Sequence, residues 1–156
     1  MLGLLLAHRQ PVDLINGQKI DVDKSLAWSN DKEYHHFFPK AYLATQGVDG
    51  TAANVVGNII LLTSVSNIAI RDSAPSAYLQ KIIETSGREA VVQRLASNLV
   101  PEDALDAALK DDYQGFLAVR GAHLHQHMGS LTGSVDVADA SPDPADDLDT
   151  DADPSD

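Results

Sequence analysis

The sequence predicts an α+β domain whose C-terminal half is mainly helical. Its 156 residues, 44% of them hydrophobic, suit one packed core, since domains commonly hold ~100 to 200 residues. Two short runs, EYHHFFP at 33–39 and NIILLT at 58–63, are aromatic or β-branched, which favours strands. Apolar residues recur at helical spacing over 75–131. We therefore expect one folded domain over 1–134.

The first third of the chain is expected to hold a helix, a tight turn and the first strand. Residues 1–9 are apolar enough for a buried helical face, and Asn16-Gly17 is a typical tight-turn pair. Pro39 ends the aromatic strand and suits the first turn of a helix over KAYLATQ, because its ring fixes φ. The glycine-punctuated residues 47–57 predict a loop.

Helices are expected to follow the second strand. Their patterns cover 64–73, 75–86, 88–100 and 101–131. Ser64 or Ser66 is the expected N-cap of the first, while Pro75 begins the second and Gly87 ends it. The buried face of that second helix is expected to carry Tyr78, Leu79, Ile82 and Ile83.

Most of the acidic charge lies in the C-terminal tail. Of the net charge of −12, nine negative charges fall between Asp136 and Asp156, where there is no Lys or Arg, which leaves −3 for the rest. This stretch has almost no bulky apolar residue to offset ordering entropy, so 135–156 is expected to be disordered. The pattern favours a solubility or salt-adaptation tail, and a DNA-mimicking tail that competes for the site is the alternative.

Cysteine is absent, which excludes thiolate metal sites and cysteine nucleophiles. Any metal ion must therefore be held by nitrogen and oxygen, and the composition fits a cytoplasmic protein. The apolar start MLGLLLA is far shorter than the ~20 residues of a membrane span and has no basic segment before it, so we expect no membrane partner.

Two adjacent histidines, His35 and His36, raise the question of chemistry. Such a pair is solvent-exposed, a pair of metal ligands, or a ligand beside a catalytic base. Neighbouring strand residues point to opposite faces, so both rings reach one site only if the strand end twists. Asn58, opening the second strand, and Asn67, on the following helix, are as often turn or cap residues as functional ones.

The order HHFFP, then GNIILLTSVSN, resembles the HNH, or ββα-metal, nuclease motif. In particular it is similar to the C-terminal nuclease domain of Gmr-type modification-dependent restriction enzymes. The similarity covers most of 1–130 and is specific over the motif core, 33–79. The third motif position holds Asn67 instead of histidine, which shifts the expected metal preference. The matching residues are Glu33, His35, His36, Phe38, Pro39, Lys40, Asn58, Ile59, Leu61, Leu62, Asn67, Ile70, Pro75, Ser76, Tyr78 and Leu79.

This resemblance implies a metal-dependent endonuclease that hydrolyses DNA phosphodiester bonds in restriction of, or defence against, foreign or modified DNA. It implies His36 as general base, a role that suits an imidazole with an ordinary pKa of ~6.5. It implies one divalent ion held by His35 and Asn67, with Mg²⁺ expected first and Mn²⁺, Ni²⁺ or Zn²⁺ as alternatives.

Other polar residues are expected to support this site. Asn58 would fix either the histidine-bearing loop or the tautomer of the base by hydrogen bonding, and Glu33 belongs to the same supporting group. Arg71, expected on the helix face of Asn67, and Lys40 are candidates for phosphate or DNA contact, with an ordinary surface role as the alternative. Asp72 would orient a ligand or cap the next helix.

Two further expectations concern a second histidine pair and the partners. His123 and His127 have the i, i+4 spacing of a chelating pair, but no acidic partner lies nearby in the helix, which favours a solvated face. The resembled enzymes carry an NTP-dependent ParB-like domain, so a separately encoded partner of that kind is expected besides DNA. The alternative function is a non-catalytic DNA- or partner-binding remnant or subunit of a restriction system.

Overall fold

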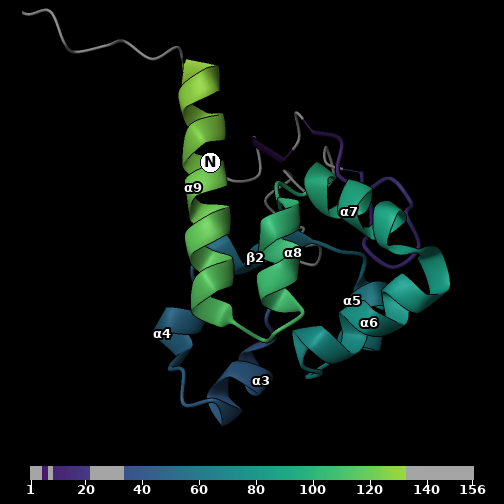
Figure 1. Ribbon diagram of the computed structural model, residues 1–156, viewed down its shortest axis with the longest axis vertical. Coiled ribbons are helices and arrows are strands. Elements are labelled where there is room, and N and C mark those ends of the chain that lie inside the picture. Colours follow the sequence, from purple (N-terminus) through teal and green to yellow (C-terminus); the bar gives the residue numbers. More distant parts are fainter. Residues whose placement is uncertain (1–4, 7–8, 22–33, 133–156) are drawn as a thin grey trace, which may run out of the picture.

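The computed structural model describes residues 5–6, 9–21 and 34–132, and within them the fold is α+β and mostly helical (Figure 1). The predicted tail at 135–156 and Glu33 lie outside the described residues. No helix in the described part is long and apolar enough to cross a membrane. The helices are α3 (Lys40–Thr45), α4 (Gly50–Ala53), the 3₁₀ helix η2 (Val56–Asn58), α5 (Ser64–Ile70), α6 (Pro75–Ser86), α7 (Arg88–Ser97), α8 (Glu102–Ala108) and α9 (Tyr113–Thr132).

The described residues include a two-stranded antiparallel sheet. It pairs β1 (Tyr34–His36) with β2 (Ile59–Leu61), and His36 faces Ile59 in the register. Helices α3, α4 and η2 lie between the two strands in the chain, and α5 follows β2. The two strands and the helix after the second strand agree with the coarse α+β class that the sequence predicts.

The chain after β1 is anchored in an aromatic cluster. Phe37 and Phe38 are fully buried. The Phe37 ring stacks on Phe116 of α9 with centroids 4.6 Å apart, and Phe38 lies 5.1 Å from the Tyr113 ring. Because two consecutive side chains enter the core, the strand cannot continue its alternation past His36. Helix α9, which runs beside α8 in Figure 1, thus fixes the end of β1.

A buried arginine ties α9 to the start of β2. The guanidinium of Arg120 donates hydrogen bonds to the backbone carbonyls of Gly57, Ile59, Asn98 and Leu99. Burial lowers the pKa of Arg120 to about 9. Since these carbonyls belong to η2, β2 and the α7–α8 connection, one side chain holds three segments together.

The observed elements differ from the expected ones in four places. The helical pattern over 101–131 forms two helices, α8 and α9, with Asp111 at a φ of 56° between them. The expected loop at 47–57 contains α4, because the Asp49 carboxylate accepts from the backbone N–H groups of Thr51 and Ala52 and caps a helical turn. The N-cap of α5 is Thr63, whereas Ser64 or Ser66 was the expected cap. Strand β2 holds three residues and is shorter than the six-residue run that predicts it. At the start of that run, Asn58 belongs to η2 and not to the strand.

Candidate functional site

Most of the predicted site residues meet in one open pocket of about 370 Å³ between β1, α3 and the end of α5. Sequence segments separated by some thirty residues supply its walls. Asn58 lies behind the pocket and does not line it. The lining residues are His35, His36, Pro39, Lys40, Ala41, Asn67, Arg71 and Asp72.

Both histidines line this pocket although they are neighbours on β1. His36 is the last residue of the strand, and the next residue already turns into the core as Phe37 N–H donates to the Asn58 carbonyl at 2.8 Å. Both side chains are half-buried. Strict alternation along a strand would place the His35 and His36 rings on opposite faces. Because β1 ends at His36, the second ring is not held to that alternation.

Asn54, which the sequence did not single out, contacts His36 directly. The Nε2 of His36 lies 3.0 Å from Oδ1 of Asn54, and because an amide oxygen accepts, this contact fits the tautomer with the proton on Nε2 and Nδ1 as acceptor. Burial lowers the pKa of His36, the Asn54 hydrogen bond raises it, and the charges of Lys40 and His35 lower it, with a net decrease. His36 is therefore neutral at pH 7.

Asn58 holds the loop that carries the histidines. Its Oδ1 accepts from Phe38 N–H at 2.8 Å, and its Nδ2 donates to the carbonyls of Phe38 and Ala53 at 3.0 Å each. This fully buried side chain thus joins the end of β1 to α4. Of the two roles expected for Asn58, these contacts fit the fixing of the loop, while the tautomer of His36 is set by Asn54.

The position of Asn67 depends on Asp13, a fully buried residue of the N-terminal segment. Its carboxylate accepts from Thr63 N–H at 2.8 Å and from the Ser66 hydroxyl at 2.7 Å, at the first turn of α5. The same carboxylate accepts two backbone N–H groups of its own turn. Burial raises the pKa of Asp13, but these hydrogen bonds outweigh it and hold the pKa below its ordinary value.

Arg71 and Asp72 line the pocket from the turn after α5. Arg71 is the C-cap residue with φ of 49°, so it follows the helix, and it lines the same pocket as Asn67. At the first turn of α6, the Ser76 amide and hydroxyl donate to Asp111 at 2.9 and 2.7 Å. The expected capping by Asp72 is thus performed by Asp111, and Asp72 remains available to the pocket.

The donor set bears on the metal ion that the motif implies. The described residues include no group of three or more His, Cys, Asp or Glu placed to hold a metal ion. An ion here would take the His35 imidazole and the Asn67 amide oxygen, with the Asp72 carboxylate in the same pocket and water or substrate at the remaining positions. Such a mixed nitrogen and oxygen set fits a divalent ion and suits Mn²⁺, Ni²⁺ or Zn²⁺ at least as well as Mg²⁺.

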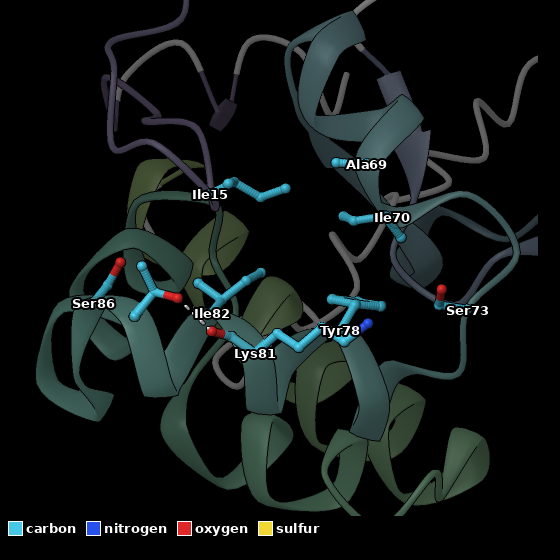
Figure 2. A pocket seen from close by; sticks show the side chains of 9 residues that line it. Ile15, Ala69, Ile70, Ser73, Tyr78, Lys81, Ile82 and Ser86 are labelled. Atoms are coloured by element: carbon cyan, nitrogen blue, oxygen red, sulfur yellow. Dashed lines mark hydrogen bonds between the residues drawn. The ribbon is translucent and has the colours of Figure 1, made fainter.

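A second pocket of about 210 Å³ lies on the other side of α5, against α6 (Figure 2). Figure 2 shows the side chains of Ile15, Ile70 and Ile82 converging on it. The Tyr78 hydroxyl at its base donates to the Phe37 carbonyl at 2.8 Å, and burial raises the pKa of this phenol well above its ordinary value. This pocket lacks the paired acid–base groups of the histidine pocket, so we assign the chemistry to the latter.

Comparisons of the chain with protein-family models, curated proteins and solved structures found no match.

Proposed function

We propose that this protein is a metal-dependent endonuclease that hydrolyses DNA phosphodiester bonds. The observation that supports the proposal best is the shared pocket of a neutral, oriented His36 with the donors His35 and Asn67. The same pocket includes Arg71 and Lys40, two cations suited to phosphate oxygens. This set provides a base, metal donors and phosphate contacts, which are the groups that phosphodiester hydrolysis requires.

The residues divide the work as follows. With Nε2–H donated to Asn54, Nδ1 of His36 takes a proton from the attacking water as its oxygen bonds to phosphorus. A divalent ion, when bound, would polarise the phosphate and stabilise the departing sugar oxygen. Arg71 and Lys40 hold the non-bridging oxygens and so orient the phosphorus toward the water.

The test is the nicking of supercoiled plasmid with Mg²⁺, Mn²⁺, Ni²⁺ or Zn²⁺. His36→Ala should reduce the rate by about 10²- to 10⁴-fold, the usual contribution of a general base. His125→Ala, which changes an exposed histidine on α9, should retain the wild-type rate and serves as the control. Asn67→Ala should require more metal ion for half-maximal rate.

Three outcomes would change the assignment. An absence of metal-dependent nicking by the wild type, or equal nicking by His36→Ala, would reject catalysis. Plasmid binding without nicking would favour a non-catalytic DNA-binding subunit. Comparison of plasmids with and without modified cytosine tests whether the proposed activity belongs to modification-dependent restriction.

A further inference from the structure

A second histidine cluster lies on α9, away from the pocket described above. His123 and His127 are one helical turn apart and line one pocket of about 280 Å³ together with Gln126 and Ser130. No residue of this pocket belongs to the pocket around His36. His125 lies between them in sequence but is exposed and absent from the lining, since it is rotated by about 200° on the helix.

The environment of these two rings differs from a solvated helical face. Both side chains are half-buried, and the Nε2 atom of His127 is buried without a hydrogen bond to any described residue. A buried polar nitrogen left in that state destabilises the fold, because it has given up its hydrogen bonds to water. Rotation of the His127 ring toward the pocket would let a ligand accept the lone pair of this nitrogen and would remove the unfavourable state.

The protonation state also suits a metal ligand. Burial lowers the pKa of His123, and the charges of His127, Arg9 and Arg120 lower it further. The lowered pKa favours the neutral ring, which has a lone pair to donate. Proton competition, which weakens histidine sites near neutral pH, is correspondingly reduced.

We propose that His123 and His127 form a second metal site, which takes a borderline divalent ion such as Zn²⁺ or Ni²⁺. Imidazole pairs at i, i+4 on a helix face one ion from consecutive turns. The Gln126 side chain and water would complete the coordination. Mg²⁺ should not bind, because it prefers oxygen ligands. The ion would link the two turns of α9 and stabilise the C-terminal part of this helix.

The experiment is a calorimetric titration of the full chain with Zn²⁺ and with Ni²⁺, together with thermal unfolding. His123→Ala and His127→Gln should each weaken one class of sites by at least about tenfold, which equals 1.4 kcal/mol. His125→Ala should change neither the affinity nor the metal-induced rise in Tm. His35→Ala should retain this class of sites, which separates it from the proposed nuclease site.

Two results would overturn the second site. The first is a His125→Ala variant that loses as much affinity as His123→Ala, since binding would then be dispersed over surface histidines. The second is unchanged Zn²⁺ and Ni²⁺ binding in both His123→Ala and His127→Gln. Helical circular dichroism of each variant tests whether it is folded. If His127→Gln unfolds, His123→Ala decides between the outcomes, because the His123 ring has no buried nitrogen without a hydrogen bond.

Discussion

The two sides of the candidate site are held by opposite means. The histidine side rests on apolar packing, because β1 runs into the buried rings of Phe37 and Phe38, with Asn58 fixing the turn between them. The Asn67 side rests on a buried charge, because the first turn of α5 is bonded to the carboxylate of Asp13. The contrast separates a part held mainly by apolar packing from a part held by an ionised carboxylate.

Helix α5 has few apolar contacts to replace that charge. Its seven residues bury Ser66 and Ile70, while Val65 and Ile68 are 76% and 61% exposed. Segments with few buried apolar contacts open locally at lower free energy than the core. Loss of the Asp13 charge should therefore loosen α5, and with it Asn67, more than it loosens the strand that carries the histidines.

The largest effect is expected on the apolar side. Phe37→Ala should reduce the free energy of unfolding by about 3 to 5 kcal/mol, because it leaves a cavity beside the stacked Phe116 ring. Urea denaturation measures the loss. Val65→Ala, at an exposed position on α5, is the control and should stay within about 0.5 kcal/mol of the wild type. A small effect of Phe37→Ala would show that the aromatic cluster does not hold the strand end.

A smaller and pH-dependent effect is expected at Asp13. Asp13→Asn should cost about 1.5 to 3 kcal/mol at pH 7, the range for hydrogen bonds to a charged group. Because the folded-state pKa of Asp13 is lowered, its contribution is present above the unfolded pKa of ~3.9 and is lost as the pH falls through the folded pKa. The wild type and the variant should therefore converge in acid.

Hydrogen exchange of α5 amides, measured against pH, locates the effect. Exchange should accelerate first in α5 for Asp13→Asn, while the amides around Phe38 stay protected. Asp49→Asn is the matched control, since this carboxylate also caps a helix but is exposed, and its loss should be smaller. Uniform acceleration over the whole chain would contradict the division into two differently held sides.

The sequence could predict features that depend on residues close together in the chain, and it could not predict contacts between residues far apart in the chain. The strands, the α6 boundaries at Pro75 and Gly87, and the tight turn at Gly17 depend on local patterns, and the structure bears them out. The α4 helix was missed because four residues with two alanines and a glycine give little periodicity, although Asp49 was a readable N-cap signal.

The contacts that shape the site are long-range and had no local signal. Asp13 reaches α5 across fifty residues, and Arg120 reaches Ile59 across sixty-one. Asn54 stands at the end of a helix that the pattern assigned to a loop, so its contact with His36 could not be anticipated. By contrast, His35, His36 and Asn67 were named from the resemblance to the HNH motif, and these residues line one pocket.

The smallest expected effect is on the pH dependence of the proposed reaction, and it tests the contact of Asn54 with His36. Asn54→Asp places a carboxylate beside Nε2 of His36, which favours the protonated ring and raises its pKa. Since the proposed base must be neutral, the acidic limb of the kcat/KM profile should move to higher pH. Asn54→Ala removes the hydrogen bond that raises the pKa of His36, so the acidic limb of its kcat/KM profile should move to lower pH. The kcat/KM plateau of this variant should fall by about 10- to 100-fold, because the ring is no longer oriented.

Nitrogen-15 chemical shifts of His36 provide a readout that does not depend on turnover. The wild-type ring should carry its proton on Nε2, and Asn54→Ala should show a mixture of both tautomers. Two results would remove Asn54 from the mechanism. One is an acidic limb of the kcat/KM profile that moves in the same direction in both variants, and the other is a wild-type His36 ring with its proton on Nδ1. If the protein shows no nicking activity but its His36 ring carries the proton on Nε2, only the proposed nuclease activity is rejected. The orienting contact with Asn54 then still holds, because the 3.0 Å contact sets the tautomer and the substrate does not.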